Sequence, residues 1–366
     1  MLPYVAIVHS WTDTAPAKAH DAAYADAGRF AADRFAAGHF AASGGLDAQM
    51  AALREGPPGP EYRKTMAADP DAFNAQLPFY RIKPLYLLVV AAFAKLTATV
   101  TEATVVVSVL SFCAFSLGLL WFAVRALGAV LGSVVGVLFA LAPTTTNVAA
   151  LSTPDALLML LTGVAAVLFV RQRPLSAAWL LTLGVLVRTD LQVFNVCLAA
   201  AWLLLAQRQP RAGLVAGVLA GSILVAAAVD AWAGNYGYAV LYRHTFIGYS
   251  PHPASLQGLN IPAALFLRNI PVGVLGGLSN GGLWLVLALL GLCAVLFWRT
   301  GQPERMAAGR AQALACCALL AAVGASICVR FVLFPSGDLR LVAPVVGILA
   351  ITLVTIAAYR PEGSLA

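Results

Sequence analysis

Residues 104–124 read TVVVSVLSFCAFSLGLLWFAV and contain no Asp, Glu, Lys or Arg. A helix needs about 20 consecutive apolar residues to cross the hydrocarbon core of a bilayer, so this stretch predicts a membrane-spanning helix. The whole chain shares this character: 61% of its 366 residues are hydrophobic and only 11% are charged. An ordinary soluble domain has about 25% charged residues. The composition therefore excludes a soluble enzyme, a disordered chain and a nucleic-acid-binding arm.

Further apolar stretches follow, separated by Arg, Pro and Gly. They lie near 127–145, 155–170, 175–187, 190–207, 211–231, 272–298, 311–333 and 341–359. With 104–124 they predict about nine crossings and an all-α, polytopic membrane protein. The stretches 155–170 and 175–187 are short for a crossing, but short helices are tolerated where they pack on protein or line a polar cavity.

Two rows of glycine recur at every fourth position: Gly128, Gly132 and Gly136, and then Gly213, Gly217 and Gly221. Small residues at this spacing let the backbones of neighbouring membrane helices approach closely. We therefore expect both rows to lie at helix–helix contacts.

The charges divide the chain into two parts. Residues 1–83 carry nine acids and eight bases, a net charge of −1, whereas the remaining residues carry seven acids and 15 bases, a net charge of +8. Short cytoplasmic loops of membrane proteins are enriched in Lys and Arg. The loops that contain Arg125, Arg171 and Arg211 belong to the more basic set, and we expect them to face the cytoplasm. The loop 232–270 then lies outside.

The segment 84–98 decides where residues 1–83 lie. Its uninterrupted apolar run, from Pro84 to Ala94, is about half the length of a crossing. We expect an amphipathic or re-entrant helix on the outer face. Residues 1–98 then form an outer segment with juxtamembrane helices, and 99–366 form the transmembrane bundle. An exported segment needs a crossing before it, and Leu2–Val8 is too short, so we expect a preceding transmembrane helix to be missing.

Polar residues gather at the predicted outer face, each beside an apolar helix. They occur in HDAAY at 20–24, FYRIKPLY at 79–86, STPD at 152–155, RTD at 188–190 and DLRLVAP at 338–344. Charged groups at membrane depth are costly, so such residues are functional candidates by default.

These motifs resemble those of the GT-C class of integral-membrane glycosyltransferases, which includes the aminoarabinose transferases and the protein O-mannosyltransferases. Asp21 followed by Tyr24 is similar to the acid and tyrosine of that class's first outer loop, and Lys83-Pro84 is similar to the step that opens its next helix. Asp155 and Arg340 resemble a later acid and a late basic residue. The chain departs from the pattern at Ala22, where some members carry a second acid.

The resemblance implies a GT-C-like bundle that moves a sugar from a polyprenyl-phosphate carrier to an acceptor hydroxyl on the outer face of a bacterial inner membrane. The acceptor would be a glycan, a lipid or a protein, and a single displacement would invert the anomeric centre. The acceptor oxygen must lose a proton, so Asp21 is the expected base, with Asp13 as its rival. Fixed cations would stabilise the departing phosphate. Lys83 and Arg81 suit that role, as does Arg340.

Further substrate-binding candidates, with structural alternatives, are Tyr24, Asp155, Arg188, Asp190 and His244. Asp155 also suits the first turn of a helix, where an acid favours the dipole. Arg188 and Asp190 also suit a pair across a helix break, and Lys83 and Arg81 suit anchors at lipid headgroups. Asp26 and Asp33 are expected to be solvated.

The expected partners are the lipid-linked donor, the acceptor and membrane lipids, without nucleic acid. No His/Cys cluster has the spacing of a zinc site, and no metal ligand is assigned. A divalent cation between Asp21 and Asp155 stays open as an alternative.

Two other functions compete with the glycosyltransferase. In a transporter or lipid flippase the same charges would line a path, and such proteins often contain inverted repeats. The two halves of this chain show no such similarity. A scaffold subunit of a membrane complex would need no polar residues converging on one face.

Overall fold

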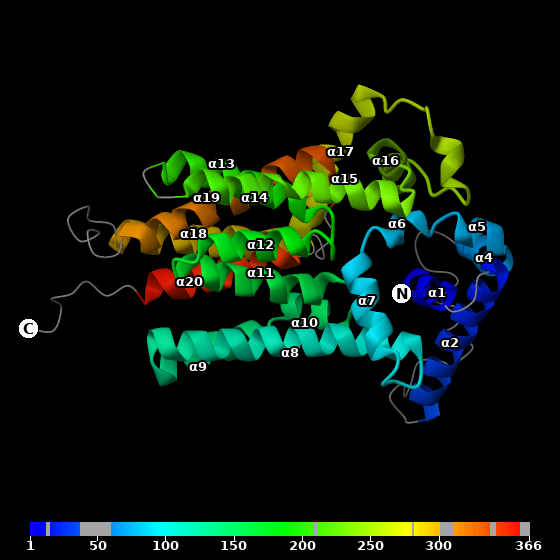
Figure 1. The fold of residues 1–366 in the computed structure, drawn as a ribbon, viewed down its shortest axis with the longest axis horizontal. Helices are drawn as coiled ribbons and strands as arrows, with labels where there is room; N and C mark the ends of the chain where they lie inside the picture. The colour runs from blue at the N-terminus through cyan, green and yellow to red at the C-terminus, as the bar shows by residue number, and fades with distance from the viewer. Residues whose placement is uncertain are drawn as a thin grey trace, which may run out of the picture. The chain divides into compact units, whose positions relative to one another are not determined.

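The computed structural model describes residues 1–11, 15–36, 60–207, 209, 211–279, 282–300, 310–336 and 342–358. Within these ranges the helices are joined by turns and loops and there is no β-strand, as expected for an all-α protein (Figure 1). The chain divides into two compact units. Unit 1 comprises 1–107 and 228–266, and unit 2 comprises 108–227 and 267–366.

Unit 1 contains mostly short helices, several of which begin with proline. They are α1 (Leu2–Ser10), α2 (Pro16–Ala36), α4 (Pro60–Ala68), α5 (Pro70–Asn74), α6 (Pro78–Arg81), α7 (Pro84–Phe93), α16 (Tyr238–Phe246) and η1 (Pro253–Leu256). Proline suits the first helical position because its missing N–H has no partner there in any case. The core of unit 1 includes α1, where Val5, Ala6 and Ile7 are fully buried.

The helix α7 covers Pro84–Phe93 and packs on α1. Its 10 residues, at about 1.5 Å each, are about half of what a bilayer core of roughly 30 Å requires. This length agrees with the expectation that α7 does not cross a membrane by itself. Its place relative to a membrane stays a prediction.

Residues from the predicted loop 232–270 pack on the N-terminal segment within unit 1. The Gln76 side-chain amide donates to the carbonyls of Ser250 and Pro251, at 3.0 and 2.8 Å. The Tyr236 hydroxyl donates to the carbonyl of Ala75 at 3.0 Å. Unit 1 is therefore assembled from two segments that are far apart in the sequence.

The start of α8 (Val100–Leu127) is fixed by Asp26 from α2. The expectation that Asp26 is solvated is wrong: it is 1% exposed, and its carboxylate accepts from the backbone N–H groups of Val100 and Thr101, each at 2.9 Å. The first N–H groups of a helix lack intrahelical partners, and a buried acceptor can satisfy them. The side chain of Asp33 lies outside the described residues.

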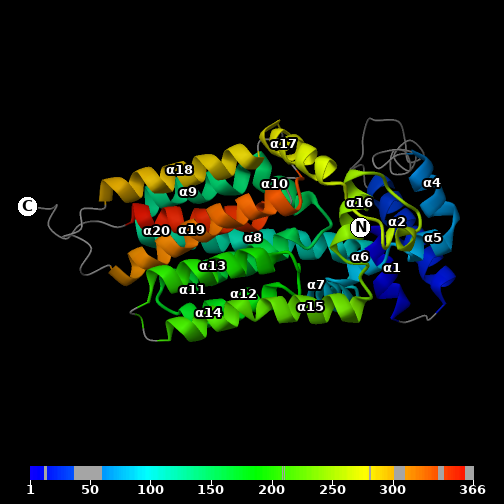
Figure 2. The ribbon, with the colours of Figure 1, turned by 90° about the horizontal axis from the view of Figure 1, so that it is seen from above.

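Unit 2 is a bundle of apolar helices, several of which run side by side (Figure 2). Besides most of α8, it contains α9 (Ala129–Leu141), α10 (Pro143–Ala150), α11 (Asp155–Val170), α12 (Pro174–Gly184), α13 (Leu191–Leu205), α14 (Ala212–Ala220), α15 (Ser222–Ala233), α17 (Ala263–Ser279), α18 (Gly282–Thr300), α19 (Arg310–Leu333) and α20 (Ala343–Ala357), of which α15 and α17 also reach into unit 1. Most of these positions match the predicted apolar stretches, but α17 begins at Ala263, within the predicted loop 232–270.

Fewer helices reach the length of a crossing than the sequence predicts. Among the described residues three are long and apolar enough, namely Val100–Leu127, Ala212–Ala233 and Ala311–Leu333, and the bent pair α17–α18 would be a fourth. The other apolar helices have 10–17 residues. By length and composition the structure supports a membrane protein. The count of about nine crossings stays a prediction.

The two glycine rows differ in whether they lie at contacts between helices. Added methyl groups at Gly132 and Gly136 would collide with α8, at the backbone of Ala123 and Val124 and at Leu120. At Gly132 and Gly136 the first row therefore allows close packing of α9 on α8, as expected, but the expectation is wrong at Gly128, where a methyl group would meet open space. The second expectation is wrong at Gly213 and Gly217, because a methyl group there would meet open space.

One aromatic ring is packed between glycines of two further helices. The Phe115 ring of α8 fills the space where side chains would stand at Gly163 of α11 and at Gly347 of α20. A methyl group at Gly163 would clash with the ring, and one at Gly347 would lie 3.2 Å from its Cζ. Three helices thus meet at one side chain.

We expect Asp26 to contribute stability that depends on pH. Burial alone would raise the pKa of Asp26, but hydrogen bonds from His9, Thr101 and Val100 outweigh it and lower the pKa from 3.8 to about 2. The contribution is then complete above pH 3.8 and is lost as pH falls through about 2. Asp26→Asn should destabilise the protein by about 1–3 kcal/mol at neutral pH.

The measurement is the thermal unfolding midpoint in detergent between pH 7 and pH 2. The midpoints of wild type and Asp26→Asn should converge toward the acid end. Asp21→Asn is the matched control, because the Asp21 side chain is 78% exposed, and it should follow wild type. A constant gap between wild type and Asp26→Asn across the pH range would contradict the assignment.

Candidate functional site

Lys83 lies in an aromatic cradle formed by Tyr4 and Tyr80, here called the Lys83 cradle. Lys83 Nζ donates to the Tyr4 hydroxyl at 2.7 Å and lies 4.9 and 5.2 Å from the ring centres of Tyr4 and Tyr80. The Tyr4 ring in turn packs edge-on against Tyr80 and Tyr86. A cation over an aromatic face is attracted by the ring quadrupole. The cradle therefore holds a positive charge at a defined point at the start of α7.

Asp21, on α2, is exposed and pairs with a buried histidine. The His20 Nδ1 lies 2.9 Å from an Asp21 oxygen, and its Nε2 lies 3.1 Å from the Met66 carbonyl. His20 therefore helps to position the exposed Asp21 side chain.

Two other predicted residues, Tyr24 and Arg81, belong to the same unit. Tyr24 packs its ring against His20, with the ring centres 4.8 Å apart. Arg81, at the end of α6, is partly exposed. Burial raises the pKa of Tyr236, and the charge of Arg81 opposes that shift. Asp21 and Lys83 contact different partners within the same unit, namely His20 and Tyr4.

His244 is buried among aromatic rings. Tyr62, Phe79 and Tyr249 pack against it, and its Nδ1 accepts the backbone N–H of Ser250 at 3.2 Å. Burial lowers the pKa of His244 to about 4, so the imidazole is neutral at pH 7. These contacts hold the segment after α16, and a role in substrate binding stays a prediction.

Unit 2 joins Asp155, Arg188 and Asp190 in one ion-pair network. Arg188 donates to Asp155 through Nη1, and to both oxygens of Asp190 at 3.0 and 2.6 Å. The Thr153 hydroxyl donates to Asp155 at 2.6 Å, and Arg330 of α19 donates to Asp190 at 2.8 Å. The network links α11, the turn between α12 and α13, and α19.

The charges of this network stabilise one another and hold the three segments together. Burial alone would lower the pKa of Arg188, but the charges of Asp190 and Asp155 raise it above its ordinary value. Two carboxylates and two guanidinium groups balance each other, as buried charges require. The pairing of Arg188 with Asp190 is confirmed. Asp155 is buried in the first turn of α11, where it also suits the helix dipole.

Arg330 was not singled out by the sequence, and its signal is a charge inside an otherwise apolar span. Arg340, Asp338 and the rival base Asp13 lie outside the described residues. Within the described ranges, no three His, Cys, Asp or Glu side chains are grouped as metal ligands would be.

Comparisons of the chain with protein-family models, with curated proteins and with solved structures found no match.

We expect Arg188 to be essential for the stability of unit 2. Arg188→Leu leaves Asp155 and Asp190 without their shared guanidinium, and breaking a buried pair costs about 3–5 kcal/mol. The matched control is Arg173→Leu, because Arg173 is exposed at the other end of α12. The measurement is the unfolding midpoint in detergent. Equal midpoints for the two variants would contradict the role of Arg188.

Proposed function

We propose that this chain is a membrane glycosyltransferase of the GT-C kind, which transfers a sugar from a polyprenyl-phosphate carrier to an acceptor hydroxyl. The proposal rests on two functional groups that unit 1 contains. This one compact unit holds an exposed carboxylate oriented by a histidine, at Asp21, and a lysine ammonium in an aromatic cradle, at Lys83. A proton acceptor and a phosphate-binding cation are the two groups that this reaction needs.

The assembly of unit 1 also supports the expected topology. Residues 1–107 and 228–266 pack together, so their polar parts lie on the same side of any membrane. The apolar helices between them must then cross an even number of times. The expected spans from 104–124 to 211–231 satisfy this condition, and the positive-inside rule puts the shared side outside.

Asp21 is the proposed general base. Its exposed carboxylate accepts the proton of the acceptor hydroxyl as that oxygen attacks the anomeric carbon. The bond from this carbon to the carrier phosphate breaks in the same displacement, which inverts the anomeric centre. His20 acts through Asp21 and is a positioning residue, because its two ring nitrogens hold Asp21 and the Met66 carbonyl.

Lys83 is the proposed partner of the leaving phosphate. The charge on that phosphate grows as the glycosidic bond breaks and the sugar becomes oxocarbenium-like. The cradle keeps the ammonium at one place before substrate arrives, so little reorganisation is needed. Arg81, two residues earlier, adds a second positive charge. Tyr24 and His244 are retained as proposed contacts to the sugar or the acceptor.

The remaining parts of the proposal concern location and partners. The apolar carrier stays within the bilayer of a bacterial inner membrane, and the acceptor reaches the site from the outer side. Asp155, Arg188 and Asp190 are proposed to keep the ends of α11, α13 and α19 in place. Contact of these three residues with substrate, expected from the sequence, stays a prediction.

We expect Glu61 and Tyr249 to face the same side of the membrane, since both are exposed and both belong to unit 1. Each is replaced by Cys in a variant without the native cysteines, and labelling by an impermeant maleimide is measured in intact cells. Both should label from outside. Gln172→Cys, in the turn after α11, is the control and should label only after the cells are opened. If all three variants were labelled only in opened cells, the location of the site on the outer face would be contradicted.

We expect Asp21→Asn and Lys83→Met each to abolish most of the transfer. Loss of a general base typically lowers the rate by about 10²–10⁴-fold. The assay supplies polyprenyl-phosphate hexoses and pentoses together with a membrane glycan extract, and measures the polyprenyl phosphate released. The readout therefore does not require the acceptor to be known.

The controls separate chemistry from folding. Asp71→Asn removes another exposed acid of unit 1 and should keep full activity. Tyr4→Phe removes the hydroxyl that accepts from Lys83 but keeps the ring, and should weaken activity less than Lys83→Met. Full release by Asp21→Asn and Lys83→Met, in folded and inserted protein, would reject the proposed site.

A further inference from the structure

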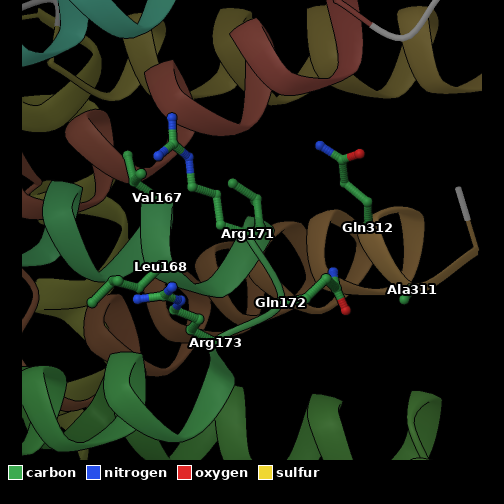
Figure 3. Close-up of a pocket in the computed structure, with 8 residues that line it drawn as sticks. Val167, Leu168, Arg171, Gln172, Arg173, Ala311 and Gln312 are labelled. Atoms are coloured by element: carbon green, nitrogen blue, oxygen red, sulfur yellow. The ribbon is translucent and has the colours of Figure 1, made fainter.

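A second candidate site lies in unit 2, at the turn between α11 and α12. A cavity of about 650 Å³ opens there, with Arg171, Gln172 and Arg173 on the turn and Gln312 across from them on α19 (Figure 3). Val167 and Leu168, on the last turn of α11, form part of its wall. The cavity thus combines two guanidinium groups and two amides with an apolar wall.

The turn that carries the arginines is held by its own backbone. The N–H of Arg173 donates to the carbonyl of Leu168 at 2.9 Å, and the N–H of Gln172 donates to that of Phe169 at 3.2 Å. Gln172 takes a left-handed conformation with φ of 61°. Such bonds close the end of a helix. Arg171 and Arg173 therefore come from a defined turn.

The positive charges at this cavity lack acidic partners within the described ranges. Arg171 lies over the rings of Trp121 and Phe122, at 5.7 and 5.9 Å, and neither it nor Arg173 forms an ion pair there. Guanidinium groups bind phosphate oxygens through charge-assisted hydrogen bonds. The cavity is therefore suited to an anion that carries phosphate.

The surroundings favour a lipid as the source of that phosphate. Trp121 is 54% exposed, and Arg125 lies 5.9 Å from its ring. Tryptophan and arginine at the end of an apolar helix mark the level of the lipid headgroups. The apolar wall at Val167 and Leu168 suits the glycerol and acyl part of the ligand, which a free phosphate lacks.

We propose that this cavity binds the phosphodiester headgroup of an anionic phospholipid, at the end of the bundle that the positive-inside rule assigns to the cytoplasm. The proposal does not depend on the glycosyltransferase reaction. Arg171 and Arg173 hold the phosphate, and Gln172 and Gln312 donate to the headgroup oxygens.

Native mass spectrometry of the full chain tests the proposal. The protein, in neutral detergent, is titrated with phosphatidylglycerol or phosphatidylcholine, and the bound fraction is measured. Wild type should retain phosphatidylglycerol preferentially. A charge near an anionic lipid is worth about fivefold in affinity, so R171Q/R173Q should bind about 25-fold more weakly. The control is R211Q, because Arg211 belongs to the same predicted face but does not line the cavity.

Each outcome decides for or against the site. Selective loss in R171Q/R173Q, with R211Q unchanged, supports it. Equal retention of the two lipids by wild type overturns it, as does an equal loss in R211Q. Displacement of the lipid by an equal concentration of glycerol phosphate would show a free-phosphate site and overturn the choice of lipid. If the double variant does not fold, R173Q alone is compared with R211Q by the same criteria.

Discussion

The structure depends on how a buried carboxylate in the middle of one helix fixes the beginning of another. Asp26 of α2 accepts from two backbone N–H groups at the start of α8, 74 and 75 residues later in the chain. These groups would otherwise be buried without partners, at a cost comparable to a lost hydrogen bond. Thr99 and Glu102 satisfy neighbouring N–H groups of the same turn. The long apolar helix therefore starts at a point that unit 1 determines.

The apolar stretches could be located from the sequence because a membrane helix has a strong local signal. The lengths of the folded helices could not be predicted in the same way. Pro and Gly within the stretches end some helices, and whether they do depends on packing. Gly132 and Gly217 show the limit most clearly. Both have the spacing of a packing motif, but only Gly132 contacts a neighbouring helix, and spacing does not specify which face of a helix has a neighbour.

The chemistry of the candidate site was partly visible in the sequence. Asp21 and Lys83 stand in short motifs, and the pairing of Arg188 with Asp190 is local. The partners that position them are distant: Tyr4 lies 79 residues from Lys83, and Arg330 lies 140 residues from Asp190. The burial of Asp26 could not be predicted for the same reason, because its role as an acceptor depends on the start of a later helix. A single sequence contains no direct signal of such contacts.

The packing of Phe115 has a consequence for how this chain can change during evolution. Its ring occupies space that side chains at Gly163 and Gly347 would need, so the three positions share one volume across α8, α11 and α20. A larger residue at either glycine is compatible with the bundle when a smaller residue replaces the phenylalanine. Related chains should therefore exchange these residues together, and such covariation would identify the three-helix junction without any coordinates.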